Sequence, residues 1–496
     1  CVCKFFIQKS FVCRQKKSMR LCFSTSTSPS SAFHHHRKSN FHRTQKTSST
    51  IVASSESSSK MEKTSLLATP LKCMIPTCVY LDYNATTPIF PEVCDEMLPF
   101  MRTHFGNPSS IHAYAVPCSV AIDVSRERVR KALGATNGKK EIVFTSCGTE
   151  SDNRAIDIAC DLFNSSASSD EATRVLPHVI STAVEHPAVL VYLESERKAK
   201  RLTYSLVPVN EEGAADVEAF EKQLAEFRDR VCCVTIMQAN NETGAVQPVR
   251  AFADLAKATN PKILVHTDAA QSFGKVKLNA DDLNVDAITI VGHKIGAPKG
   301  IAALFLRESF LSERTKEIIS NGGNLDPYRS FLKGGGQEGG KRAGTENVLH
   351  IVGLGKACEI ADEEFDAFVA HTKRMRDLLF EKLKASTKIG DRVFANGPKD
   401  DAKRLPNTLS VAIKGVNAGA LLVELKDQLA ASAGAACHSS EDGGGAISGV
   451  LLAMRLEESL ARGTLRLSVG RHTTEEEISR AVEAIEAVAS RQIENK

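Results

Sequence analysis

A lysine stands directly after a predicted buried strand and is flanked by glycines. Lys294 follows the apolar run 287–291 within Gly292-His293-Lys294-Ile295-Gly296. Most lysines are solvated surface charges, but a lysine held against an aldehyde can form a Schiff base, which is a common form of covalent catalysis. On its own the residue indicates little. Its place at a strand end makes it the first candidate for chemistry in this chain.

A carboxylate ends another predicted strand. Asp268 closes the run Ile263-Leu264-Val265-His266-Thr267 and lies 26 residues before Lys294. An aspartate in this place is more often a helix cap. Beside a Schiff-base lysine, however, a carboxylate can keep the nitrogen of a pyridine ring protonated, so that the ring withdraws electrons. The pair therefore predicts a site for a cofactor of the pyridoxal type.

The elements that would position these groups alternate between short strands and longer helices. Buried strands are predicted at 142–144, 179–180, 231–237, 263–265 and 287–291. Several are followed at once by polar or glycine-bearing segments, as in Thr145-Ser146-Cys147-Gly148-Thr149. In a mainly parallel sheet such segments fall at the carboxyl ends of the strands, where α/β folds place their ligands. We therefore predict an α/β fold with a site built from many strand ends.

Helices dominate the later part of the chain. The region 347–385 is predicted to be mainly helical, and a second domain follows it. Near the end, Thr474 and Glu477 form a capping box ahead of apolar residues at helical spacing. This pattern predicts a C-terminal helix with one face packed on the domain.

The N-terminal segment differs in composition from the rest of the chain. Residues 1–55 contain ten Lys and Arg and no acidic residue, which leaves 53 basic and 59 acidic residues in the remainder. A mildly acidic body argues against a nucleic-acid groove. We expect residues 1–75 to be a disordered tail. It fits either a transit peptide for a chloroplast or mitochondrion, or a non-native extension of a cytoplasmic protein.

Other classes of protein are disfavoured. No run of 18 apolar residues is present, so no membrane span is predicted. The 14 cysteines show no C-x-x-C spacing, which argues against a zinc site or a disulfide framework and favours reduced thiols inside a cell. Gly334-Gly335-Gly336-Gln337-Glu338-Gly339 matches a dinucleotide fingerprint, but it lacks the flanking strand and helix that this motif needs.

An ordered set of motifs resembles the NifS-like cysteine desulfurases, from about Val79 to the C-terminus. The last two motifs resemble the selenocysteine lyase branch in particular. The motifs are Tyr80-Leu81-Asp82-Tyr83-Asn84-Ala85-Thr86-Thr87-Pro88, Gly106-Asn107-Pro108-Ser109-Ser110, Thr149-Glu150-Ser151-Asp152-Asn153, Glu185-His186, Asn240-Asn241-Glu242-Thr243-Gly244, Asp268-Ala269-Ala270-Gln271-Ser272, His293-Lys294, Gly434-Ala435-Ala436-Cys437-His438-Ser439 and Leu465-Arg466-Leu467-Ser468-Val469-Gly470-Arg471.

The resemblance implies a pyridoxal 5'-phosphate enzyme with the fold of aspartate aminotransferase. That fold has a large domain with a mixed, mostly parallel sheet, expected at 76–361, and a smaller α+β domain, expected at 362–496. Lys294 would be the Schiff-base lysine, Asp268 the partner of the ring nitrogen and His186 the residue stacked on the ring. The other cofactor-binding positions that the resemblance implies are Gly148, Thr149, Asn241, Gln271, His293 and Thr345.

The resemblance also implies how the substrate is held. Arg466 would grip its carboxylate, with Asn241 and Asn84 nearby, and Cys437 would attack its sulfur or selenium. Thr345 matches a position that reaches the phosphate of a neighbouring subunit, which implies a homodimer. A protein that accepts the sulfur or selenium is a further expected partner, whereas nucleic acid, membrane and metal are not expected.

Three residues depart from the family pattern. Cys147 replaces a common glycine in the phosphate loop, and Gly339 replaces the arginine of Gly-Gly-Gly-x-Glu-Arg. Val291 stands where the desulfurase branch has a phosphate-binding serine, so one hydroxyl contact worth about 1 kcal/mol is lost. None of these changes removes a group with a central role.

The resulting hypothesis is removal of sulfur or selenium from L-cysteine or L-selenocysteine, with L-alanine as product. Two alternatives stay open. One is another aminotransferase or β-lyase of the same fold, in which Cys437 would be superfluous. The other is an inactive scaffold in sulfur assembly, which the complete set of Lys294, Asp268, His186, Arg466 and Cys437 disfavours.

Overall fold

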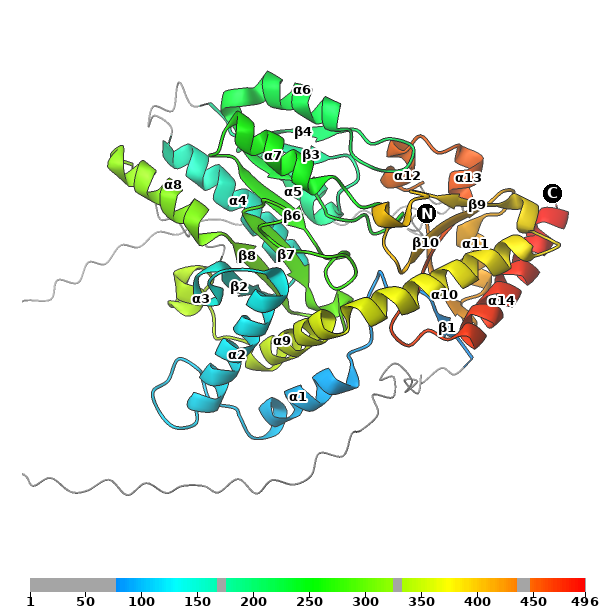
Figure 1. The fold of residues 1–496 in the computed structure, drawn as a ribbon, viewed down its shortest axis with the longest axis horizontal. Helices are drawn as coiled ribbons and strands as arrows, with labels where there is room; N and C mark the ends of the chain where they lie inside the picture. Colours follow the sequence, from blue (N-terminus) through cyan, green and yellow to red (C-terminus); the bar gives the residue numbers. More distant parts are fainter. Residues whose placement is uncertain (1–76, 167–174, 324–331, 435–446, 496) are drawn as a thin grey trace, which may run out of the picture. The chain divides into compact units, whose positions relative to one another are not determined.

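A seven-stranded sheet lies at the centre of the larger part of the molecule (Figure 1). The computed structural model describes residues 77–166, 175–323, 332–434 and 447–495. Five neighbouring strands are parallel, and β8 runs antiparallel to both of its neighbours, β2 and β7. The strand order is β2 (Ile142–Thr145), β8 (Ala302–Leu306), β7 (Ala287–Val291), β6 (Leu264–Asp268), β5 (Val231–Thr235), β3 (His178–Thr182) and β4 (Thr203–Val207).

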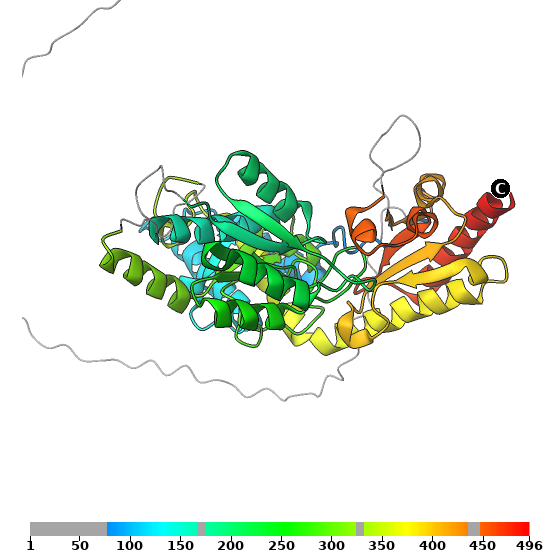
Figure 2. The same cartoon turned by 90° about the horizontal axis from the view of Figure 1, so that it is seen from above.

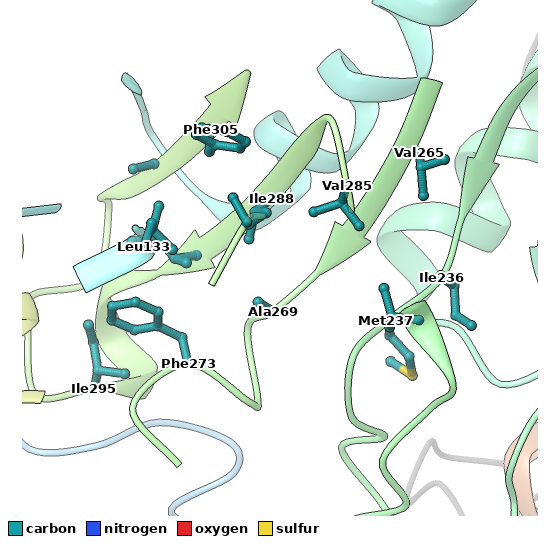
Figure 3. Close-up of a cluster of buried hydrophobic side chains, with 14 of the residues drawn as sticks. Leu133, Ile236, Met237, Val265, Ala269, Phe273, Val285, Ile288, Ile295 and Phe305 are labelled. Atoms are coloured by element: carbon teal, nitrogen blue, oxygen red, sulfur yellow. The ribbon is translucent and has the colours of Figure 1, made fainter. Parts of the chain in front are cut away.

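Helices cover both faces of this sheet, because its central strands are apolar on both sides. On one face, side chains of α4 (Gly148–Ser166), α5 (Pro187–Lys198) and α8 (Glu308–Ser320) join those of the strands in one buried cluster. On the other face a second cluster includes residues of α1 (Pro91–Arg102), α2 (Val116–Leu133), α6 (Val217–Phe227), α7 (Val249–Thr259) and α9 (Val348–Glu363). Figure 3 shows part of that second cluster, with Leu133, Phe273, Ile288 and Phe305 pointing into one apolar layer.

A smaller antiparallel sheet lies at the centre of the other part of the molecule, which Figure 2 shows from another side. Its order is β12 (Ser432–Ala433), β13 (Thr464–Ser468), β10 (Thr408–Ile413) and β9 (Val393–Asn396). Side chains of α10 (Phe365–Ala385), α11 (Ala418–Glu424) and α14 (Glu475–Glu494) fill its core. The chain also enters here, because β1 (Val79–Tyr80) pairs in parallel with β11 (Leu429–Ala430) and buries Val79 and Leu81 in the same cluster.

The described residues also form several short helices and turns. They are α3 (Gly138–Glu141), α12 (Gly449–Ala453), α13 (Glu458–Arg462) and the 3-10 turns at Arg228–Arg230, Gly292–Lys294, Gln337–Gly340, Gly390–Arg392 and Asp401–Lys403. None of the helices in the described ranges combines the length and the apolarity that crossing a membrane requires.

The predicted fold class is confirmed, as are the helices at 347–385 and the C-terminal helix. The predicted helical region contains α9 and α10, which meet at Glu364. The capping box is formed as expected: Thr474 N donates to Glu477 Oε2 over 2.9 Å, and Glu477 N donates to Thr474 Oγ1 over 3.2 Å. The tail at 1–75 and Cys437 lie outside the described residues.

Candidate active site

Polar segments gather at one edge of the large sheet, because the strands before them run in the same direction. They follow the ends of β2, β3, β5, β6 and β7. The candidate residues that they carry are Gly148 and Thr149, His186, Asn241, Asp268 and Gln271, and His293 and Lys294. Arg466 joins them from the small sheet through β13, where it contacts Asn241.

Lys294 is held by backbone carbonyl groups rather than by a carboxylate. Its Nζ donates to Asn84 O over 2.5 Å and to Ala85 O over 2.8 Å. Removal of the amine from water lowers its pKa to about 8, with the Arg466 charge acting in the same direction and the carboxylates Asp268 and Asp82 opposing. A lysine with this pKa has a substantial neutral fraction near neutral pH, and a neutral amine is the form that can attack a carbonyl carbon.

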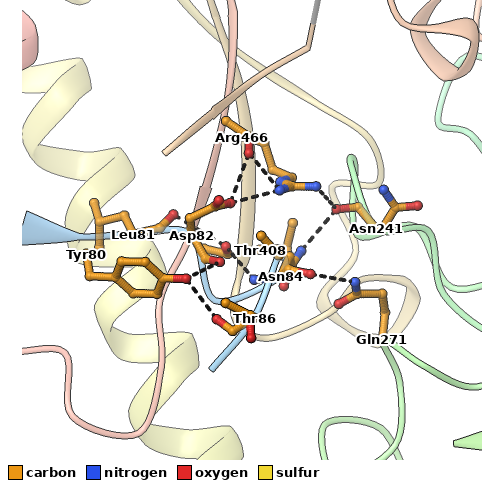
Figure 4. Close-up of polar contacts among 12 residues, drawn as sticks. Tyr80, Leu81, Asp82, Asn84, Thr86, Asn241, Gln271, Thr408 and Arg466 are labelled. Carbon is orange, nitrogen blue, oxygen red and sulfur yellow. Dashed lines mark hydrogen bonds and ion pairs between the residues drawn. The ribbon is translucent and has the colours of Figure 1, made fainter. Parts of the chain in front are cut away.

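Asn84 connects the two sheets at the site (Figure 4). Its side-chain amide donates to Asn241 O over 3.1 Å and to Thr408 Oγ1 over 2.8 Å. Its backbone oxygen also accepts from Gln271 Nε2 over 2.9 Å, besides the bond from Lys294. Asn84 is buried, with 1% of its surface exposed, so these bonds are protected from water. The residue fixes the positions of Lys294 and Gln271 relative to each other.

Asp268 lies buried at the end of β6 and accepts a hydrogen bond from Ala270 N over 2.8 Å. Burial raises its pKa, while the nearby His186 and Lys294 counteract that rise. A buried carboxyl with one backbone donor retains the capacity to accept a further hydrogen bond. A protonated ring nitrogen is a donor that could satisfy it.

His186 caps the N-terminus of α5. Its Nδ1 accepts from Ala188 N over 3.1 Å, which requires an unprotonated Nδ1. Burial lowers the pKa of His186, and the Lys294 charge lowers it further, whereas the Asp268 charge raises it. The imidazole is thus a neutral ring that is held in a fixed orientation, with part of its surface open to solvent.

Residues before and inside the first turn of α4 are open to solvent. Ser146, Cys147 and Thr149 are exposed, and the first backbone N–H groups of a helix have no intrahelical partner. Gly148 packs closely on Val291, since a Cβ added at Gly148 would lie 2.7 Å from Val291 Cγ2. Val291 therefore fills the space beside this turn, and its side chain offers no hydroxyl group there.

His293 lies in the turn that directly follows β7 and is also neutral. Its Nδ1 is 3.2 Å from Thr86 Oγ1, and burial together with Lys294 and Lys299 lowers its pKa to about 4.

Arg466 is oriented by three oxygen atoms (Figure 4). Its Nη2 donates to Asp82 Oδ1 and to Ser432 Oγ, each over 2.8 Å, and its Nη1 donates to Asn241 O over 3.3 Å. Its Nε is buried and has no partner among the described residues. The guanidinium group thus has donor capacity that its partners in the described residues do not use.

The predicted residue Thr345 is not brought into this cluster, and Gly339, one of the departures from the family pattern, also lies outside it. Thr345 is exposed, and its neighbour Arg342 pairs with Glu150 of α4. Gly339 adopts a left-handed φ of +65° beside Glu338, whose carboxylate accepts from Arg126 over 2.7 and 2.8 Å. This ion pair anchors the loop from outside the site, so the glycine at 339 occupies a turn that favours glycine.

Sequence reasoning missed several polar groups at the site. Asp82 was part of a quoted motif but had no assigned role, and it pairs with Arg466. Glu185 accepts from Met237 N and from Thr182 Oγ1, and burial raises its pKa to about 8. Lys275 lies four residues after Gln271 and contacts it. The spacing of four is the one signal that could have indicated this last contact.

Comparison with known proteins identifies the class of protein that this fold and site define. The family model described as aminotransferase class-V matches residues 79–481. A selenocysteine lyase of Bos taurus is 39% identical over 431 residues, covering 83% of this chain and 93% of the relative. A cysteine desulfurase of Trichormus azollae is 40% identical over 415 residues, with the same two coverages. A solved NifS-like protein is 31% identical with a TM-score of 0.69, covering 83% of this chain and 99% of its own.

The chain therefore belongs to the aminotransferase class-V family, and the resemblance seen in the sequence is confirmed. Members of this family are pyridoxal phosphate enzymes.

Proposed function

We propose that this protein removes sulfur or selenium from L-cysteine or L-selenocysteine and releases L-alanine, with pyridoxal 5'-phosphate as its cofactor. The observation that carries the proposal is the convergence of Lys294 and Asp268, at one edge of the large sheet, with Arg466 of the small sheet. The pKa of the lysine suits attachment to an aldehyde, the buried carboxyl suits a pyridinium nitrogen, and the guanidinium group suits a carboxylate.

The residues present fit the cofactor at each of its polar groups. Lys294 would hold its aldehyde carbon, Asp268 its ring nitrogen and Gln271 and Asn241 its phenolic oxygen, while His186 would cover the ring. The first turn of α4, with Gly148, Thr149 and the neutral His293, would hold the phosphate. When bound, pyridoxal phosphate withdraws electrons from the bonds around the substrate α-carbon.

The chain's own residues supply the remaining steps. Arg466 would bind the substrate carboxylate through donors that it does not use on Asp82, and Asn241 and Asn84 would border the same space. Lys294, once released as a free amine, would carry a proton to and from the substrate. Its contacts with two carbonyl oxygens keep it within this space.

Cys437 is the proposed acceptor of sulfur. Its thiolate would attack the substrate sulfur, the carbon–sulfur bond would break, and the persulfide would remain on the enzyme while the carbon gains a proton. Gly434, three residues earlier, is hydrogen-bonded to Thr464 and Ser448 and follows Ser432, which contacts Arg466. The proposal requires the three residues from Gly434 to Cys437, which span about 10 Å when extended, to carry the thiol to a substrate bound by Arg466.

A homodimer is the proposed assembly. Apolar side chains are exposed over α1, α2 and the loop that joins them, and those at 116, 120 and 124 form a stripe along α2. The exposed set is Leu98, Met101, Phe105, Ile111, Tyr114, Val116, Val120 and Val124. A second copy would cover this surface and bring Thr345 to the partner's phosphate. Sedimentation of the parent and of Val120→Asp tests the proposal: the parent should be a dimer and the variant shifted to monomer, whereas a monomeric parent would contradict it.

The functional test is product analysis on both amino acids. Purified protein with cofactor should convert L-cysteine and L-selenocysteine to L-alanine in amounts that match the sulfur or selenium released. A keto acid in place of alanine would indicate an aminotransferase. The absence of turnover with both substrates would indicate a scaffold.

A further inference from the structure

A second lysine lies buried behind the site and is not used by the reaction described above. Lys275 is 5% exposed and lines a mainly apolar cavity with Phe273, Lys294 and Arg471. Within the described ranges no carboxylate forms an ion pair with it, and its one hydrogen bond through Nζ goes to Gln271 Oε1, over 3.3 Å. A buried amine without an ion pair is costly to the fold, so its presence calls for a role.

The local backbone brings the two side chains together. Lys275 N and Val276 N both donate to Ser272 O, and Phe273 N donates to Ala269 O, so the chain turns as in a helix. Residues four apart then lie on the same side, which places Lys275 against Gln271.

The contact determines which end of the Gln271 amide faces the site. An ammonium group can only donate, so Lys275 binds the amide oxygen. The amide nitrogen therefore points the other way and donates to Asn84 O, which Lys294 also binds. Lys275, Gln271, Asn84 and Lys294 form one connected set of hydrogen bonds.

We propose that Lys275 is a positioning residue, whose ammonium group holds Gln271 so that its amide nitrogen is presented to the cofactor. The role rests on the proposed function, because it assumes that Gln271 binds the cofactor's phenolic oxygen. A neutral amine could also accept from the amide, and the orientation would then be less well defined. The contact is thus charge-assisted and fixes the amide orientation when Lys275 is charged, and it is weaker and less selective for the amide oxygen when the amine is neutral.

The surroundings of Lys275 place this change within an accessible pH range. Burial lowers the pKa of Lys275 to about 7, and the positive charges of Lys294 and Arg466 add to the effect. The other charged groups of the cavity are Arg471 and Glu364, which pair with each other over 2.6 Å. Because the pKa is lowered, the charge-assisted contact is fully present below about pH 7 and weakens as the pH rises through that value.

The test compares cofactor affinity in the parent and in Lys275→Met at pH 6 and pH 9, using cofactor-free full-length protein titrated with pyridoxal phosphate. Loss of a charged hydrogen bond should weaken binding about tenfold at pH 6 and less than about twofold at pH 9. Lys277→Met is the matched control, since Lys277 is exposed two residues further on. Its cofactor affinity should equal that of the parent at both pH values.

A double-mutant cycle separates positioning from a general structural effect. If Lys275 acts through Gln271, then Lys275→Met should add little to the loss of affinity already caused by Gln271→Met. The proposal would be overturned if Lys275→Met weakened cofactor binding by the same factor at both pH values. Additive losses of affinity in the double-mutant cycle would overturn it as well. A parent that does not bind the cofactor would overturn the proposed function as well, so the two failures are distinguishable.

A second measurement needs no variant of Lys275. In cofactor-free parent protein labelled with side-chain ¹⁵N-glutamine, the Gln271 amide signal is assigned by its loss in Gln271→Met. Its proton shift should change with a midpoint near pH 7. An amide signal that does not move between pH 6 and pH 9 would contradict the proposal.

Discussion

The contact between Gly148 and Val291 gives a quantitative test of how the proposed phosphate site is built. A Cβ at Gly148 would lie 2.7 Å from Val291 Cγ2, whereas unstrained carbon atoms are separated by about 3.5 to 4.0 Å. Gly148→Ala therefore requires a displacement of about 1 Å in β7 or in the first turn of α4. Overpacking of this kind costs about 1 to 3 kcal/mol. Because the displaced turn carries the N–H groups proposed to bind phosphate, affinity for pyridoxal phosphate should fall as well.

The compensating change identifies the cause. Val291→Ala removes the methyl group that the new Cβ would meet, so Gly148→Ala with Val291→Ala should be more stable than the sum of the two single losses by about 1 kcal/mol or more. Urea unfolding of the four cofactor-free proteins measures this coupling, and equilibrium titration gives the cofactor affinity. Strictly additive losses would refute the reasoning, because they would show that the two side chains do not compete for the same space.

Further predictions concern the reacting groups. The rate at which cofactor-free protein attaches pyridoxal phosphate should rise with pH through about 8, because the lowered pKa of Lys294 gives about one-tenth neutral amine at pH 7. Stopped-flow absorbance measures this rate. A rise centred near pH 10 would contradict the burial of the Lys294 amine. Arg466→Ala should raise KM for cysteine and selenocysteine alike by about tenfold or more, since both carry the same carboxylate; an unchanged KM in steady-state assays would remove Arg466 from substrate binding. Cys437→Ala should abolish desulfuration of cysteine and spare part of the selenocysteine cleavage, because selenol is the better leaving group; persulfide formation at the parent level in that variant would exclude Cys437 as the acceptor.

The strand ends of the large sheet were predictable because their pattern is local. Each buried strand is a short apolar run, and the polar residues that follow it, such as Asp268 and Lys294, must lie at one edge once the strands are parallel. The antiparallel direction of β8 was not predictable in this way. The run Ala302–Leu306 is apolar on both faces like its neighbours, and an apolar pattern carries no information on strand direction.

The connections that complete the site join residues far apart in the chain. Asn84 bonds to residues at 241, 271, 294 and 408, and Asp82 reaches Arg466, 384 residues later. Such contacts depend on how the small sheet meets the large one, which no local spacing encodes. The entry of the chain beside β11 has the same origin, because two residues of β1 are too few to indicate their partner.

The most direct test of the central claim is to locate the covalent attachment of the cofactor. Protein incubated with pyridoxal phosphate is reduced with borohydride, digested and mapped by mass spectrometry, with Lys294→Ala treated in parallel. The proposal predicts loss of the visible colour on reduction, a phosphopyridoxyl group on the peptide that contains Lys294, and no specific adduct in the variant. A stoichiometric adduct on another lysine, such as Lys275, or no adduct in the parent, would contradict it.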